Sequence, residues 1–191
     1  MARINKDWID AYFEYGIDIS NRKVFLFDDI DSGSIGAVIK GLYLMESQDD
    51  TKPIELFVGS FGGSEYEMFA LYDVCRTLVS PIHTTAIGKC MSASPLLVAA
   101  GEIGHRYATP HTFFMVHEGW EDIGIKRLEE LSVDLKHYRQ MGQKWGELMG
   151  KHSKKPSKFW LNLCKKPGDT FFNAEQALEW GLIDYIWEEK E

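Results

Sequence analysis

Short apolar runs alternate with stretches of helical periodicity along this chain, and that alternation limits the folds available to it. Runs typical of buried strands occupy residues 23–27, 54–58, 82–87 and 112–117. Between them, apolar residues recur every three or four positions, which is the spacing of a helix with one buried face. Repeated alternation of strands and helices predicts a parallel, layered α/β fold.

Start and stop signals place helices between and after these runs. Ser64 and Glu67 have the spacing of a capping box, and Asn173 with Gln176 repeats that spacing. Gly101 and Gly181 are suited to the position that follows a helix end. The predicted helices run from about 34 to 45, 64 to 78, 92 to 100, 125 to 149 and 173 to 181.

One domain accounts for most of the 191 residues. Apolar residues make up 45% of the chain, which is enough for a full core, and no repeat or linker divides it. Residues 1–20 are expected to form an N-terminal segment with its own aromatic side chains, docked on the domain. The domain itself is expected to span residues 21–191.

Charge and cysteine content exclude several classes of protein. A net charge of -8 argues against nucleic-acid binding, which needs clustered Lys and Arg. The sequence has no signal-peptide pattern and no apolar run of membrane-spanning length. Three cysteines without CxxC spacing are typical of free thiols in a reducing compartment. We therefore expect a soluble cytoplasmic protein without nucleic-acid or membrane partners.

Polar and glycine-rich segments follow three of the predicted strands. G-S-F-G-G occupies 59–63, Ser92 and Ser94 follow 82–87, and His117 ends 112–117. Ligands of parallel α/β folds gather at the carboxyl ends of strands. Each feature alone is explained as well by structure: an N-cap serine, a glycine turn or a hydrogen-bonded histidine. Together, a serine, a histidine and a Gly-Gly loop at one sheet edge are what acyl transfer requires.

Metal-binding patterns are missing from the sequence. There is no HExxH motif, and no His/Cys pair has zinc-ligand spacing. Residues 28–33 resemble the start of a calcium loop, but counting from Asp29 places Lys40 where the loop needs its twelfth-position glutamate. We read 28–33 as the start of a helix and expect no metal site and no cofactor.

Four segments of the chain resemble motifs of the ClpP family of self-compartmentalising serine peptidases. G-S-F-G-G (59–63) corresponds to Asn-Ser-Pro-Gly-Gly, and G-K-C-M-S-A-S (88–94) to Gly-Gln-Ala-Ala-Ser-Met-Gly. R-Y-A-T-P … M-V-H-E (106–118) corresponds to Arg-Tyr-Ala-x-Pro … Met-Ile-His-Gln. The C-terminal motif of the family corresponds to residues 168–184, G-D-T-F-F-N-A-E-Q-A-L-E-W-G-L-I-D. The resemblance extends from about residue 17 to residue 187.

The resemblance implies a set of site residues. Ser92 takes the position of the nucleophile, His117 that of the general base and Asp169 that of the acid. The oxyanion donors carried over by position are the backbone N–H groups of Gly63 and Ala93. The implied activity is that of a serine endopeptidase acting on peptides or unfolded proteins.

The same resemblance implies an architecture and an assembly. The fold is that of the ClpP and crotonase families, a layered arrangement of β-β-α and βαβ units with a protruding handle helix at about 125–150. Seven copies form a ring, and two rings stack into a chamber of fourteen. An AAA+ unfoldase is the implied partner, and polypeptides are the implied substrates.

The chain departs from the family pattern at several positions. Phe61 replaces the loop proline, Ser94 replaces a glycine, and Glu118-Gly119 replaces Gln-Pro. Glu55 replaces an aromatic residue of the unfoldase-docking groove. The glycine-rich strand is poorly preserved in 119–124. These departures are expected of a specialised member, such as one encoded by a phage, and Ser94 is expected to be a helix-start residue.

Two other functions remain open at this point. A crotonase-like enzyme would bind an acyl-CoA thioester and use the same two oxyanion N–H groups, but it would not need the serine, histidine and aspartate. A catalytically silent scaffold subunit would share the fold, although silent relatives usually lack one member of the triad.

Overall fold

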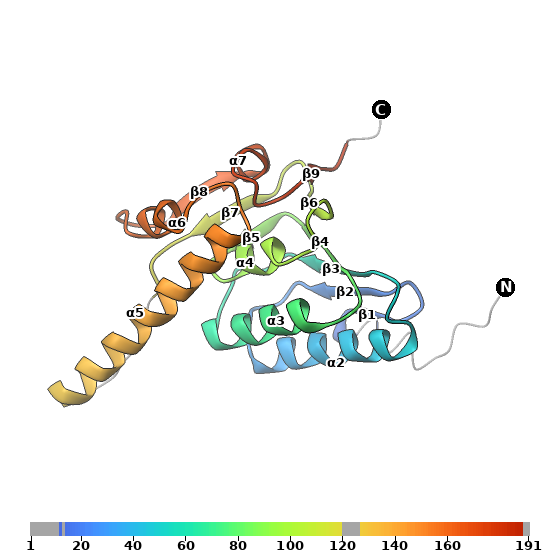
Figure 1. The fold of residues 1–191 in the computed structure, drawn as a ribbon, viewed down its shortest axis with the longest axis horizontal. Helices are drawn as coiled ribbons and strands as arrows, with labels where there is room; N and C mark the ends of the chain where they lie inside the picture. The colour runs from blue at the N-terminus through green and yellow to red at the C-terminus, as the bar shows by residue number, and fades with distance from the viewer. Residues whose placement is uncertain (1–11, 13, 120–126, 189–191) are drawn as a thin grey trace.

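A six-stranded sheet lies at the centre of the part of the chain that the computed structural model describes, residues 12, 14–119 and 127–188 (Figure 1). The strand order is β1-β2-β3-β4-β6-β9, with β1 antiparallel to β2 and the other pairs parallel. Its strands are β1 (Ile17–Asp18), β2 (Lys23–Leu26), β3 (Ile54–Val58), β4 (Ile82–Ala86), β6 (Arg106–Ala108) and β9 (Tyr185–Ile186).

A second, smaller sheet holds the strand that precedes His117. Its strands are β5 (Lys89–Met91), β7 (Phe113–Val116) and β8 (Thr170–Asn173), with β7 parallel to β5 and antiparallel to β8. The sequence predicted that the glycine segment, the serines and His117 lie at one sheet edge. That prediction was wrong in detail, because β3 belongs to the large sheet whereas β5 and β7 belong to the small one.

Helices cover one face of the large sheet and fill the space between the two sheets. α2 and α3 lie side by side against the large sheet, and all six residues of α4 are buried (Figure 1). The helices are α2 (Ser32–Gln48), α3 (Glu65–Thr77), α4 (Ser94–Ala99), α5 (Leu128–Lys151), α6 (Ser157–Cys164) and α7 (Ala174–Glu179).

The predicted helix starts are confirmed at three positions. Asp31, in the segment read as a helix start, caps α2 by accepting the N–H groups of Gly33 and Ser34. Ser64 caps α3, and Asn173 caps α7 in a reciprocal pair with Gln176. Each cap satisfies N–H groups that the first helical turn leaves without a partner.

The helix predicted for residues 92–100 begins later than expected. α4 starts at Ser94, while Ser92 and Ala93 form a turn between β5 and α4. Gly101 directly follows the C-cap residue Ala100, as predicted. A Cβ at Gly101 would lie 2.4 Å from Thr84 Oγ1, so the close approach of β4 requires glycine there.

The long amphipathic helix is present as α5, but only part of its apolar stripe is covered. Met141, Trp145 and Leu148 are buried against the body of the molecule, whereas Leu135 is 42% exposed. α6 packs closely on the C-terminal half, where a Cβ at Gly146 would lie 2.6 Å from the Leu161 side chain. The N-terminal half extends beyond the body (Figure 1).

Several predictions concern residues outside the described part of the chain. The docked N-terminal segment is described only from Tyr12 onward, and the Tyr12 ring meets Phe25 of β2 edge-on at 5.8 Å. Trp8 and Phe13 lie outside the described residues, as do residues 120–126, which include most of the 119–124 segment.

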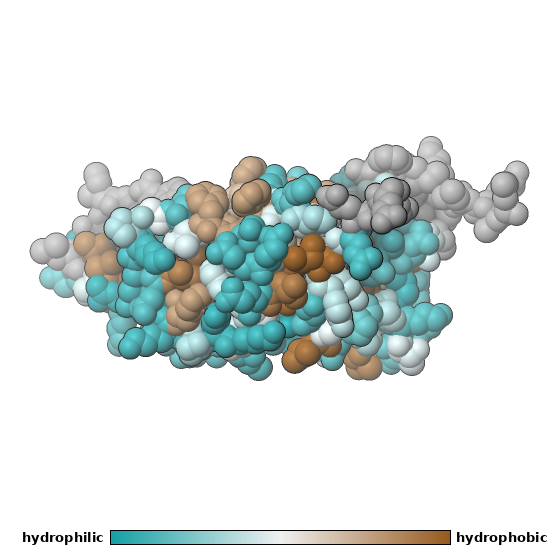
Figure 2. All heavy atoms as spheres, turned by 90° about the horizontal axis from the view of Figure 1, so that it is seen from above, coloured by the Kyte–Doolittle hydropathy of each residue, from teal (hydrophilic) through white to brown (hydrophobic). Residues whose placement is uncertain are grey.

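Among the residues that the structure describes, no helix is long and apolar enough to cross a bilayer. In the view of Figure 2, hydrophobic residues form separate patches among hydrophilic ones.

Candidate active site

Ser92 lies on a sharp turn between the end of β5 and the start of α4, in the segment Met91–Ser94, which we call the nucleophile turn. Its φ of +58° places an ordinary L-residue in the left-handed region, which favours glycine. The Ser92 N–H donates to the Met115 carbonyl at 2.8 Å, which holds the turn against β7. A serine on such a turn presents its hydroxyl instead of burying it in the helix.

His117 reaches Ser92 directly. Ser92 Oγ and His117 Nε2 are 2.8 Å apart, a hydrogen-bond distance. The contact follows from strand register, because Met91 pairs with Met115 and the two parallel strands end at the same level. With the hydroxyl as donor and Nε2 as acceptor, the imidazole is placed to remove the hydroxyl proton.

Asp169 lies on the other side of the imidazole. Val116 pairs with Thr170 in antiparallel register, so the residue before β8 is opposite the residue after β7. His117 Nδ1 and Asp169 Oδ1 are 3.8 Å apart, which is longer than a hydrogen bond but short enough for an ion pair. The Asp169 side chain is 48% exposed. The structure thus brings the three residues together in one row, with a looser contact at the aspartate.

Aromatic packing fixes the segment that carries Asp169. The Phe172 ring of β8 stacks on Phe114 of β7 at 5.2 Å and contacts Trp180 at 4.8 Å. Thr170 Oγ1 also donates to the Leu163 carbonyl at the end of α6. The strand that begins one residue after Asp169 is therefore anchored from both sides.

The glycine loop, residues 59–63, follows β3 and packs against the nucleophile turn. Gly62 and Gly63 have φ values of +104° and +146°. A Cβ on Gly62 would lie 2.6 Å from Ser92 Cβ, and one on Gly63 would lie 2.3 Å from the Ile30 carbonyl oxygen. Both positions therefore require glycine for close approach as well as for backbone conformation.

In the described part of the chain, two backbone N–H groups at this site have no hydrogen-bond acceptor: that of Ala93, next to Ser92, and that of Gly63, in the loop that packs on the nucleophile turn. The Gly62 N–H is instead used by Ser60 Oγ at 3.1 Å. Unpaired donors next to a nucleophile can stabilise the negative oxygen that forms when a carbonyl is attacked.

The three cysteine thiols are unreactive at neutral pH. Cys75, Cys90 and Cys164 are free and buried. Burial raises the pKa of Cys75 and of Cys164 to about 12, and it raises the pKa of Cys90 well above its ordinary value. These thiols stay protonated at neutral pH and are poor nucleophiles.

Metal ligands are not clustered in the described residues, where no group of three or more His, Cys, Asp and Glu side chains could hold an ion.

The departures at positions 94, 61 and 55 have structural explanations. Ser94 is the first residue of α4 and carries no positive φ, so a serine there causes no backbone strain. Phe61 is 60% exposed, and Lys89 Nζ lies 3.8 Å from the centre of its ring. Glu55 forms an ion pair with Lys23 across β3 and β2 at 3.4 Å.

Two residues that shape the site were missed from the sequence. Ile30 holds the glycine loop through its backbone, accepting from the Ser64 N–H and donating to the Gly62 carbonyl, both at 2.8 Å. Ser60 binds the Gly62 N–H from within the loop. Ser60 lies within the motif at 59–63, but neither role could be predicted, because Ile30 acts through backbone atoms and Ser60 through a single hydroxyl.

Ser92 lies on a strand-to-helix turn, is hydrogen-bonded to a histidine and has N–H groups nearby that are unpaired in the described residues. This arrangement is typical of a serine hydrolase on an α/β scaffold. Comparison with known proteins narrows this class. The model of the Clp protease family matches residues 8–190. The chain therefore belongs to the Clp protease family and is a serine peptidase.

Named relatives agree with this assignment. ATP-dependent Clp protease proteolytic subunit 2 of Streptomyces coelicolor is 30% identical over 178 residues, which cover 93% of this chain and 81% of the relative. Proteolytic subunit 3 of Synechococcus sp. strain CC9605 is 27% identical over 183 residues, covering 94% and 87%. The proteolytic subunit of Deinococcus radiodurans is 28% identical over 177 residues, covering 92% and 85%. At these identities the chain is a divergent member.

Proposed function

We propose that this chain is a serine endopeptidase subunit in which Ser92 is the nucleophile, His117 the general base and Asp169 the residue that orients the imidazole. The observation that carries the proposal is the 2.8 Å hydrogen bond between Ser92 Oγ and His117 Nε2. The unpaired N–H groups of Gly63 and Ala93 support it, because acyl transfer needs donors for the developing oxyanion.

The proposed reaction follows from these positions. Ser92 Oγ attacks the scissile carbonyl while His117 Nε2 takes its proton, and the carbonyl oxygen accepts hydrogen bonds from Gly63 and Ala93. The imidazolium then gives its proton to the leaving amine, and an acyl-enzyme remains on Ser92. Water, deprotonated by His117, releases the acyl group. Asp169 stabilises the imidazolium, and closing its contact from 3.8 Å by about 1 Å would form a hydrogen bond.

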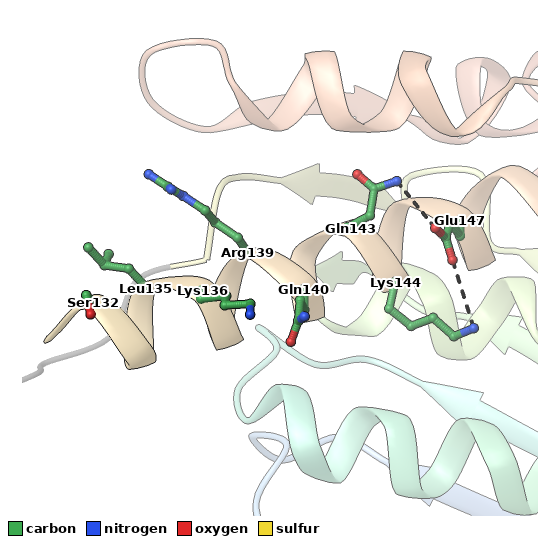
Figure 3. A pocket seen from close by; sticks show the side chains of 8 residues that line it. All are labelled: Ser132, Leu135, Lys136, Arg139, Gln140, Gln143, Lys144 and Glu147. Atoms are coloured by element: carbon green, nitrogen blue, oxygen red, sulfur yellow. Dashed lines mark hydrogen bonds and ion pairs between the residues drawn. The ribbon is translucent and has the colours of Figure 1, made fainter. Parts of the chain in front are cut away.

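We further propose that the peptidase works inside an oligomeric chamber. α5 is the element for stacking rings, since its N-terminal half extends beyond the body (Figure 1) and the side chains from Ser132 to Glu147 in Figure 3 line one open face of the helix. That face presents Leu135 together with the cations Lys136, Arg139 and Lys144 (Figure 3). A ring of seven copies, stacked in pairs, would enclose the sites and admit only unfolded chains.

An AAA+ unfoldase is the proposed partner of this chamber in the cytoplasm. The face of the large sheet that points away from α2 and α3 carries aromatic residues. Phe25 and Phe57 stack at 4.8 Å, and Trp187 meets Phe57 at 6.4 Å. Phe27 and Trp187 are 47% and 43% exposed, so this surface offers apolar area to a partner.

The two alternatives are less well supported by the site. An acyl-CoA enzyme has no use for a serine hydrogen-bonded to a histidine. A silent scaffold subunit would leave Ser92 without an activating base, whereas the Ser92–His117 contact is already formed in the single chain.

Hydrolysis of a disordered protein substrate by the assembled enzyme tests the proposal. Replacing Ser92 with Ala is expected to lower the rate by about 10³-fold or more, because the acyl-enzyme can no longer form. Ser47→Ala is a suitable control, since Ser47 is exposed and its hydroxyl only donates to the Leu44 carbonyl of its own helix. Full activity of Ser92→Ala would refute the assignment.

A further inference from the structure

Two buried hydroxyls lie between the glycine loop and the nucleophile turn. Ser60 and Ser94 both have 0% exposure, although serine is usually found at the surface. Ser94 Oγ donates to the Ser60 carbonyl at 3.3 Å, and Ser60 Oγ accepts the Gly62 N–H at 3.1 Å. The Ser94 side chain therefore links α4 to the backbone of the glycine loop, and the Ser60 side chain fixes the backbone within that loop.

The glycine loop is held on two sides. On one side, the backbone of Ile30 binds Gly62 and Ser64 at 2.8 Å each. On the other side, the Ser60 carbonyl accepts both the Met91 N–H, at 3.1 Å, and the Ser94 hydroxyl. The second anchor is the one that sets how far the loop lies from the nucleophile turn.

That distance matters because the two oxyanion donors of the proposed function belong to different elements. The Gly63 N–H is on the glycine loop, and the Ala93 N–H is on the nucleophile turn. An oxyanion must lie about 2.7–3.1 Å from both donors at once, so a shift of one element against the other opens the site. Both donors are backbone groups, so their own side chains cannot correct such a shift.

We propose that Ser60 and Ser94 are positioning residues, a buried clamp that fixes the Gly63 N–H relative to the Ala93 N–H and Ser92 Oγ. The inference rests on the proposed function, since it concerns the transition state formed at Ser92. Ser60 has a second part in the clamp. By binding the Gly62 N–H it turns that group inward and leaves the Gly63 N–H as the donor of the loop.

The Ser94 half of the clamp is a feature of this chain. In the family pattern that the segment resembles, a glycine occupies this position, and glycine has no hydroxyl to offer. Ser94 is the first residue of α4, and its side chain reaches back to the loop from there. The serine therefore adds a side-chain hydrogen bond to the loop that a glycine at this position could not make.

The chain contains a matched control for this hydrogen bond. Thr84 is also 0% exposed, and its Oγ1 donates to the Val98 carbonyl at 2.7 Å. That bond joins β4 to the other end of the same helix, α4. Removing the Thr84 hydroxyl eliminates a buried hydrogen bond like that of Ser94, but it leaves the hydrogen bonds that hold the glycine loop in place.

Steady-state kinetics of the assembled enzyme with a fluorogenic peptide test the clamp. Ser94→Ala and Ser60→Ala are expected to lower kcat about tenfold with little change in KM, because only transition-state stabilisation is lost. Both variants should weaken binding of a peptide boronate by a similar factor, since its tetrahedral adduct mimics the transition state. Thr84→Val should lower the melting temperature by a similar amount but leave kcat and boronate affinity unchanged.

The outcomes separate this inference from the proposed function. Wild-type kcat in folded Ser94→Ala and Ser60→Ala would overturn the clamp and leave the Ser92 mechanism standing. An equal fall of kcat in Thr84→Val would also overturn it, because the loss would then follow general packing. Absence of turnover and of boronate binding in the assembled wild type would overturn both. If Ser60→Ala does not fold, Ser94→Ala and Ser94→Gly decide the question together.

Discussion

At the scale of single residues, the site depends on backbone conformations that most side chains avoid. Ser92 adopts a φ of +58°, and Gly62 and Gly63 have positive φ directly opposite it. Such conformations are found where the surrounding structure enforces them, and they are common at functional sites. Here the enforcement comes from Met115, which holds the Ser92 N–H, and from Ile30, which holds the glycine loop.

The first prediction concerns the contact between Gly62 and Ser92. Gly62→Ala would place a Cβ 2.6 Å from Ser92 Cβ, so the loop or the turn must move and peptidase activity should be lost. Gly104→Ala is the control, because Gly104 also has a positive φ, +88°, but no atom within 4 Å of the added Cβ. Each variant should lose about 1 kcal/mol of stability from the backbone alone. Equal activity in the two variants would contradict the proposed site geometry.

At the scale of elements, the site is built from two short strands, of which the sequence predicted β7, as the run 112–117, but not β5. β5 has three residues and β7 four, yet their register brings Ser92 to His117. The five-residue strand β3 was predicted with its exact limits, because an apolar run of that length bounded by turn residues is distinctive. β6 and β9, with three and two residues, show no period and were missed.

Some residues of the candidate site could be found from the sequence pattern, and others could not. Ser92, Ser94 and His117 were candidates from the sequence because polar residues that follow strands gather at sheet ends, and the family resemblance chose Ser92 over Ser94. Asp169 came from the family resemblance alone, since nothing in its neighbourhood predicts that β8 pairs antiparallel with β7. Ser94 was predicted to start a helix, which is confirmed, but its bond to Ser60 depends on packing between elements distant in sequence.

The junction between α3 and the C-cap of α5 gives the second prediction. His152 Nε2 is hydrogen-bonded to Tyr72 OH at 2.8 Å. Burial, together with Arg76, Lys151 and Arg106, lowers the pKa of His152 to about 4 from an ordinary value of 6.5. The unfolded chain therefore takes up a proton below about pH 6.5, whereas the folded protein does so only near pH 4. The free energy of unfolding should fall across this interval as the pH drops.

Chemical denaturation at several pH values checks this expectation. His152→Gln keeps an acceptor for the Tyr72 hydroxyl but cannot titrate, so its unfolding free energy should depend less on pH between 6.5 and 4 than that of the wild type. Identical pH dependence in both proteins would show that His152 is not held neutral in the fold.

At the scale of the whole molecule, the chain leaves apolar surface that a single copy does not cover. The N-terminal half of α5 extends from the body with Leu135 and Val133 exposed at 42% and 66%. The amphipathic stripe continues along this helix beyond the part that Met141, Trp145 and Leu148 bury against the body (Figure 1). The sequence predicted the helix from its periodicity, but it could not show that only the C-terminal part of the stripe is buried by the same chain.

The third prediction is that α5 stacks the proposed rings. Leu135→Asp puts a negative charge on the open face of α5 and should convert particles of fourteen copies of the 21.9 kDa chain into particles of seven, as measured by mass photometry. The monomer fold should be unaffected because Leu135 is exposed. Ile103→Asp is the control, since Ile103 is 75% exposed and lies in the loop between α4 and β6. An unchanged particle mass in Leu135→Asp would argue against this role.

The central claim is that His117 activates Ser92 for nucleophilic attack, and the mass of the intact protein after treatment with a fluorophosphonate tests it most directly. If His117 activates Ser92, the assembled wild type should form one covalent adduct, Ser92→Ala should form none, and Ser94→Ala should form the adduct more slowly. An unlabelled wild type, or a labelled Ser92→Ala, would contradict this claim.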